Sequence, residues 1–337
     1  MHADFELENA LREIRKMRAK IVLVQLPEGL KGKGTEIARM IERGTGAATV
    51  LSAEPCYGAC DIADDAAKAL GADLVLHIGH AKIPNLKTGV LTVFVPLHYE
   101  IGAKAAQETA EKIKKTGFKK AGLCSTIQYA QFLPALKKEL EKMGVTAFIG
   151  KGGARIAEEG QVLGCDCSSV RAVEKKADAV VFAGDGMFHP IAVSYCTKKP
   201  IIMANPKTNP VSVLVFDSAA EREKFIRRRF GAIARAKDAK VFGIIMGTKK
   251  GQMREGEAMR AKRIIEAKGR EAVLLASSFV REEYFTGMGI DCFVSTACPR
   301  IAPEDGLHWK KPVLTVRELE ILLGKRKAGD YAFDALG

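Results

Sequence analysis

Short apolar segments alternate with amphipathic helical patterns along almost the whole chain. The segments include residues 20–26, 73–78 and 178–183, and the helical patterns between them commonly end at a glycine. Apolar strands separated by helices are typical of a parallel sheet that is covered on both faces. The sequence therefore predicts an α/β protein.

The same order of elements recurs three times, at a spacing of about 110 residues, which indicates an internal repeat. Residue identity between the units is low, so the repeat rests on the order of the elements. Connecting helices are predicted near residues 102–116 and 219–236. We expect three similar domains arranged around a pseudo-threefold axis: residues 1–105, 106–215 and 216–337.

Helix ends are predicted from capping residues. Thr35 is expected to cap the N-terminus of a helix that ends before Gly44. Thr315 and Glu318 form a capping box at the start of the final helix, which Gly324 ends. The tail beyond residue 325 is expected to be loosely held.

Composition excludes several classes of protein. The chain has 337 residues, of which 47% are hydrophobic and 28% are charged, as in ordinary globular proteins. No apolar run approaches the ~18 residues that a membrane span needs. Residues 1–8 are acidic and resemble no signal peptide. We therefore expect a cytoplasmic protein with eight reduced cysteines. These cysteines are expected to serve as metal ligands, redox groups or core residues.

The net charge of +13 favours an anionic substrate, an acidic partner or nucleic acid. The basic residues are scattered, in pairs such as Lys119–Lys120 and Lys249–Lys250, as on a solvated surface. Direct binding of nucleic acid is therefore not expected as the main role.

Unusual residues gather where the predicted strands end, which is where parallel α/β sheets bind ligands. Three cysteines lie in such positions, at equivalent ends of the three units and close to glycine or proline: Cys60, Cys165 and Cys298. Around a pseudo-threefold axis, all three thiolates would point at one centre. Two further strand-end loops are candidates for contact with a polar substrate, and they contain Pro27, Glu28, Gly29, Asp185 and Gly186.

Three convergent thiolates suit a 4Fe–4S cluster with one iron open to substrate. Zinc with three cysteines and a water is the alternative. Cys124, Cys196 and Cys292 are interpreted as core residues, and His77 and His80 flank a strand end as weaker ligand candidates.

Local cysteine motifs do not settle the chemistry. Cys56 and Cys60 form C-x₃-C, and Cys165 and Cys167 form C-x-C. The C-x₃-C-x₂-C motif of ordinary S-adenosylmethionine radical enzymes is absent, because residue 63 is alanine. No P-loop, dinucleotide-binding glycine motif or H-E-x-x-H motif is found.

Three strings resemble a known family: Tyr57-Gly58-Ala59-Cys60, residues 160–165 (GQVLGC) and Ala297-Cys298-Pro299-Arg300. They are similar to those of the 2-(3-amino-3-carboxypropyl)histidine synthases, the first-step enzymes of diphthamide biosynthesis, in their archaeal single-gene form. The resemblance extends from residues 26–29 to about Trp309.

The resemblance implies three α/β domains around a 4Fe–4S cluster, with Cys60, Cys165 and Cys298 as its ligands. Cys56 departs from the family pattern, and the roles of Cys56 and Cys167 stay open. The implied transferase moves the 3-amino-3-carboxypropyl group of S-adenosylmethionine to C2 of a histidine in translation elongation factor 2. It does so by a non-standard radical mechanism that leaves methylthioadenosine. An electron donor and a homodimer are implied as well.

Two alternatives remain from the residues alone. A quinolinate-synthase-like dehydratase would share three units and a three-cysteine cluster but use the open iron as a Lewis acid. A basic scaffold for RNA or ribosomal partners would bind RNA in a salt-dependent way and hold no cluster.

Overall fold

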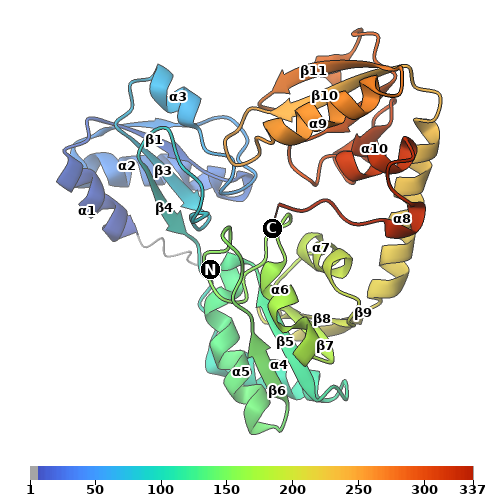
Figure 1. The fold of residues 1–337 in the computed structure, drawn as a ribbon. Helices are drawn as coiled ribbons and strands as arrows, with labels where there is room; N and C mark the ends of the chain where they lie inside the picture. Colours follow the sequence, from blue (N-terminus) through green and yellow to red (C-terminus); the bar gives the residue numbers. More distant parts are fainter. Residues whose placement is uncertain (1–6, 337) are drawn as a thin grey trace.

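Three lobes, each built on its own sheet, surround a common centre (Figure 1). The computed structural model describes residues 7–336. Within this part of the chain, no helix combines the length and the apolar character that crossing a bilayer requires. The three sheets confirm the predicted α/β class.

The first lobe has a four-stranded parallel sheet in the order β2-β1-β3-β4. Its elements are α1 (Leu7–Met17), β1 (Ile21–Gln25), η1 (Glu28–Lys33), α2 (Gly34–Thr45), β2 (Ala48–Leu51), α3 (Asp64–Ala69), β3 (Leu74–Gly79) and β4 (Thr92–Pro96).

The second lobe has five strands in the order β6-β5-β7-β8-β9, and only β9 runs antiparallel. Its elements are α4 (Ala103–Lys114), β5 (Lys120–Ser125), η2 (Ile127–Phe132), α5 (Leu133–Lys142), β6 (Thr146–Ile149), α6 (Ser168–Val173), η3 (Glu174–Lys176), β7 (Ala179–Ala183), α7 (Phe188–Cys196), β8 (Ile201–Asn205) and β9 (Ser212–Phe216).

The long helix α8 runs along the right side of the view, from the second lobe up to the third (Figure 1). The third lobe has a parallel sheet in the order β11-β10-β12-β13. Its elements are α8 (Ser218–Arg235), β10 (Val241–Gly247), α9 (Glu255–Glu266), β11 (Glu271–Ser277), η4 (Glu282–Phe285), β12 (Cys292–Ser295), η5 (Asp305–Leu307), β13 (Val313–Thr315), α10 (Val316–Leu322) and η6 (Ala328–Asp330).

One aspartate repeats in all three lobes, just before the third strand. Its carboxylate accepts backbone N–H groups where the first strand begins: Asp73 from Lys20 and Ile21 at 2.7 and 2.9 Å, Asp178 from Lys120 at 3.0 Å, and Asp291 from Lys240 and Val241 at 3.0 Å each. The shared strand order and this shared contact show that the three units are built alike. The boundaries between them stay a prediction.

Several element ends differ from the sequence prediction. Helix α2 begins at Gly34 rather than after Thr35. It ends at Thr45, and Gly46 rather than Gly44 is the glycine that follows it, with a φ of +76° that glycine adopts without strain. The sequence does not predict strands β4, β8, β9 and β13, because a proline lies within each one or no more than two residues before it, and prolines usually indicate loops. The capping box of α10 is present as predicted.

The C-terminal tail is held firmly, contrary to the sequence prediction. The carboxylate of Asp334 pairs with Arg254 at 2.8 and 3.0 Å, and the Phe333 ring lies 5.1 Å from that of Tyr195. The backbone N–H of Leu336 donates to the carbonyl of Cys165 at 2.9 Å. The tail therefore links the third lobe to the second near the centre of the molecule (Figure 1).

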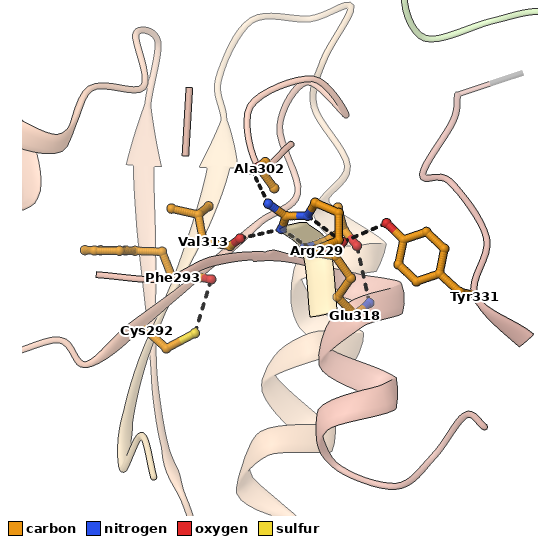
Figure 2. A network of polar contacts seen from close by, with 8 residues as sticks. Arg229, Cys292, Phe293, Ala302, Val313, Glu318 and Tyr331 are labelled. Carbon is orange, nitrogen blue, oxygen red and sulfur yellow. Dashed lines mark hydrogen bonds and ion pairs between the residues drawn. The ribbon is translucent and has the colours of Figure 1, made fainter. Parts of the chain in front are cut away.

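A buried ion pair fastens α8 to the third lobe (Figure 2). The Arg229 guanidinium donates to both carboxylate oxygens of Glu318 at 2.8 and 2.7 Å, and both side chains are 1% exposed. Arg229 also donates to the carbonyls of Ala302 and Val313, and the Tyr331 hydroxyl donates to Glu318 at 2.9 Å. Each buried charge is thereby paired and hydrogen-bonded.

Candidate iron–sulfur site between the three lobes

Loops from all three lobes line one central cavity of about 220 Å³. Cys60 enters it from the first lobe, Cys165 from the second and Cys298 from the third, and each is half-buried. The structure thus brings together three thiols that lie far apart in the sequence.

The loop that carries Cys60 is held by charges and close packing. Asp61 accepts the backbone N–H of Tyr57 at 3.2 Å, and its carboxylate lies 2.5 Å from the ammonium of Lys249 in the third lobe. A side chain on Gly251 would collide with the backbone of Cys60. This contact requires glycine at position 251 and fixes the loop against the third lobe.

The loop that carries Cys165 continues from strand β5. Residue 161 pairs with Ser125 at the end of that strand, and Ser169 donates to the Gln161 carbonyl at 2.7 Å. Gly160 has φ +74°, and an added Cβ would lie 2.4 Å from Leu133. The glycine lets the chain turn closely over the core and extend toward the cavity.

Cys298 reaches the cavity from a different topological position. Cys60 and Cys165 follow the edge strands β2 and β6, whereas Cys298 follows β12, an interior strand. The expectation of equivalent positions is therefore wrong for the third lobe. After its edge strand β11, the chain forms η4, whose Phe285 packs against Phe293 and Trp309 in the core instead.

Burial raises the pKa of all three thiols. The pKa of Cys165 rises to about 11 and that of Cys298 to about 12, mainly through burial and in part through the neighbouring cavity thiols. The pKa of Cys60 also rises, for the same reason of burial, although a hydrogen bond from Gln252 to its sulfur at 3.4 Å opposes the shift. Three thiolates would repel one another here, and bound metal cations would relieve that repulsion while releasing protons.

Two arginines give the cavity unpaired donors. Among the described residues, Nε of Arg155 and both Nε and Nη1 of Arg300 are buried without a hydrogen-bond partner. Arg300 also lies over the Phe188 ring, 4.1 Å from its centroid. Arg300 pairs with Glu304 and Arg155 donates to the Gly251 carbonyl, but the remaining buried N–H groups are costly without a partner, so an anionic group bound nearby would satisfy them. Three thiolates beside such donors fit an anionic iron–sulfur cluster and an acidic substrate.

The predicted substrate residues do not line this cavity. Pro27, Glu28 and Gly29 follow β1, and Glu28 pairs with Lys31 at 2.7 Å. Asp185 and Gly186 are exposed, just before the Phe188 that does line it. Their role in substrate binding stays a prediction.

The remaining cysteines lie elsewhere. Cys124 and Cys292 are buried in strands, as predicted for core residues. Cys167 is buried and Cys196 is half-buried in the core of the second lobe, where the two interact. Cys56 is buried and does not line the cavity.

Sequence reasoning missed several residues that line the cavity or contact its thiols. Arg300 lies two residues after Cys298, in one of the three strings that indicate the family, so the sequence could have placed it near the cavity. Arg155 and Gln252 sit in loops without a recognisable motif. Their contact with the thiols depends on how the lobes meet, which the sequence does not show.

Comparison with known proteins gives consistent matches. The family described as "Putative diphthamide synthesis protein" matches residues 26–332. A 2-(3-amino-3-carboxypropyl)histidine synthase of Pyrococcus horikoshii is 38% identical over 97% of this chain and 92% of its own. Another, of Methanocaldococcus jannaschii, is 28% identical over 99% and 93%. A crystal structure of Dph2 from Pyrococcus horikoshii with a 4Fe–4S cluster matches with a TM-score of 0.88 and 37% identity, covering 100% of this chain and 95% of that one.

Three α/β lobes that each bring one thiol to a shared cavity define a class of proteins suited to a central metal cluster. Within that class, the chain belongs to the diphthamide synthesis protein family. It is an enzyme, a transferase, as are its relatives by name. This membership sets aside the dehydratase and the non-catalytic scaffold.

Proposed function

We propose that this chain binds a 4Fe–4S cluster and transfers the 3-amino-3-carboxypropyl group of S-adenosylmethionine to C2 of a histidine in translation elongation factor 2. Cys60, Cys165 and Cys298 are the proposed ligands. The observation that carries the proposal is the meeting of these three thiols in one cavity. The names of its relatives and the cluster in the related Pyrococcus structure support it.

When bound, the cluster supplies one iron without a cysteine ligand and one electron for cleavage of a carbon–sulfur bond. Overall, the bond from sulfur to the γ-carbon breaks and a bond from that carbon to histidine C2 forms. The histidine loses a proton and methylthioadenosine leaves. The electron used for the cleavage is recovered when the product forms, so the overall transfer consumes no reductant.

Residues in and beside the cavity have proposed roles in positioning. Arg155 and Arg300 have buried N–H groups that a carboxylate can accept, and the aminocarboxypropyl group carries one. Phe188, 45% exposed at the cavity, is available to pack against the substrate. Gln252 donates to the Cys60 sulfur, a contact that tunes a bound cluster.

The remaining proposals concern the setting of the reaction. Reduced cysteines suit the cytoplasm, where translation factors are found. The charge of +13 favours an acidic or RNA-associated protein partner. We expect a homodimer and an external electron donor. Pro27, Glu28, Gly29, Asp185 and Gly186 remain candidates for binding S-adenosylmethionine, although they do not line the central cavity.

Product analysis tests this function. The anaerobically purified protein is incubated with dithionite, elongation factor 2 and S-adenosylmethionine labelled in the aminocarboxypropyl group. We expect methylthioadenosine and label on the wild-type factor, and no label on a factor whose target histidine is replaced by alanine. Release of deoxyadenosine, or no cleavage by protein with a full complement of iron, would contradict the proposal.

A further inference from the structure

A second group of side chains that could bind a metal lies in the first lobe, beside the three-thiol site. The sulfur of Cys56 and one ring nitrogen from each of His77 and His80 all lie within 4.8 Å of one another. Nε2 of His77 is 3.0 Å from Nδ1 of His80 and 4.0 Å from the Cys56 sulfur. We propose that these three side chains bind a zinc ion.

The separations match a tetrahedral site. With Zn–N bonds of ≈ 2.0–2.1 Å and Zn–S of ≈ 2.3 Å, tetrahedral ligands stand about 3.3 Å apart for two nitrogens and about 3.6 Å apart for nitrogen and sulfur. The observed separations of 3.0 and 4.0 Å are close to these values, and the third pair, Cys56 with His80, lies within 4.8 Å, so small shifts of the side chains would complete the site.

A neighbouring amide fixes the proton on His77. The Gln25 side chain donates through Nε2 to the Asp61 carbonyl at 2.7 Å, and its Oε1 accepts the Ala63 N–H at 3.1 Å. Oε1 therefore also accepts from Nδ1 of His77, at 3.0 Å. The proton sits on Nδ1, so the lone pair of Nε2 faces His80 and Cys56. An oxygen that orients a histidine in this way is the usual outer partner of a metal ligand.

Burial makes a metal the fitting occupant. His77 is 0% exposed and Cys56 is 3% exposed, and the Cys56 sulfur lies 3.9 Å from the Asp61 carbonyl and near the backbone N–H of Gly58. One thiolate and two imidazoles are ligands that zinc prefers. Three protein ligands leave a fourth position for water. His80 also lines the central cavity, so that side of the site faces the cavity.

The site would order the loop of the cluster cysteine. Cys56 and Cys60 share one loop, whereas His77 lies within β3 and His80 directly follows that strand. A zinc ion would tie this loop to the strand. It would also occupy Cys56, which is the cysteine nearest in sequence to Cys60 and otherwise able to compete for iron.

Metal counts on single variants test the site, independently of the proposed function. Protein produced with both metals and purified anaerobically should contain about one zinc and about four irons per chain. Cys56→Ser should lose the zinc and keep the iron. Cys60→Ser should lose the iron and keep the zinc, and the buried-cysteine control Cys124→Ser should keep both.

Cobalt provides a second readout. Co²⁺ is added to the variant in which Cys60, Cys165 and Cys298 are all serine. We expect tetrahedral d–d absorption with a thiolate charge-transfer band, and the band should vanish when Cys56→Ser is added. If adding Cys56→Ser unfolds the protein, His80→Gln is added in its place. A circular dichroism melt shows whether each variant is folded. Absence of stoichiometric zinc or cobalt, or loss of zinc with Cys60→Ser while Cys56→Ser retains it, would overturn the proposal.

Discussion

Single charged residues join the first and third lobes beside the cavity. The Asp61 carboxylate and the Lys249 ammonium are 4% and 10% exposed and lie 2.5 Å apart. Lys249 also sits over the Phe279 ring, 3.8 Å from its centroid. The next pair, Lys250 with Asp64, spans 3.1 Å but leaves the lysine 41% exposed. The two lysines are adjacent in sequence yet differ in burial.

That difference leads to a matched prediction. Lys249→Met leaves a buried carboxylate without its counter-ion, so we expect a loss of about 3–5 kcal/mol in the free energy of unfolding. Lys250→Met should cost only about 0–1 kcal/mol, because its pair is partly solvated. Urea unfolding of the two variants measures both values. Equal losses would show that Lys249 does not join the lobes as described.

The repeated aspartates predict a pH dependence. Backbone N–H groups of Val241 and Lys240 lower the pKa of Asp291, and those of Ile21 and Lys20 lower the pKa of Asp73. A lowered pKa means that the folded state favours the carboxylate. Its contribution is therefore present above the ordinary aspartate pKa of about 3.9 and disappears as the pH falls through the lower folded value.

Melting temperatures of Asp291→Asn check this expectation. The variant should melt below the wild type at neutral pH, and the gap should narrow once the pH falls below about 4. Asp65→Asn, on an exposed side chain of α3, serves as the control. If the difference in melting temperature instead widens as the pH falls, the Asp291 carboxylate does not stabilise the fold in the way described.

At the scale of elements, α8 is the connection between the second lobe and the third. Arg229 anchors it to α10 through Glu318 and to β13 through the Val313 carbonyl (Figure 2). The same carboxylate accepts the Thr315 N–H at 2.8 Å, so the capping box and the ion pair share one side chain. Tyr331 brings the tail to this point as well.

Arg229→Met should therefore destabilise the third lobe. It leaves Glu318 buried without its counter-ion, and we expect a loss of about 3–5 kcal/mol. Arg227→Met on the same helix removes an exposed pair with Glu223, and should cost about 0–1 kcal/mol. Thermal unfolding of both variants makes the comparison. A wild-type melt for Arg229→Met would contradict a role for this network.

At the scale of the whole molecule, the lobes meet through loops at the carboxyl ends of their strands. Arg155 of the second lobe donates to the Gly251 carbonyl of the third at 3.2 Å, and Gln128 of the second donates to the Gly79 carbonyl of the first at 3.3 Å. The tail adds the hydrogen bond from Leu336 to Cys165. The cavity therefore exists only where all three lobes come together.

The sequence predicts the lobes well because periodicity and glycine stops are local signals. It also singles out the three cysteines, because each lies in a strand-end loop rich in glycine or proline. Arg155 and the tail were beyond its reach, because their partners belong to other lobes and no local pattern encodes how lobes pack. The sequence predicts the proposed zinc ligands only in part. It offers His77 and His80 as ligand candidates, but only the fold brings Cys56 to them.

The central claim is that one thiol from each lobe holds a single cluster, and an anaerobic iron and sulfide count with an electron-resonance spectrum after reduction tests it most directly. The wild type should carry about four irons and four sulfides per chain, with the signal of a reduced 4Fe–4S cluster. Each of Cys60→Ala, Cys165→Ala and Cys298→Ala should lose most of the iron and the signal, while Cys292→Ala keeps both. Full iron occupancy in any of the three cavity variants would contradict the claim.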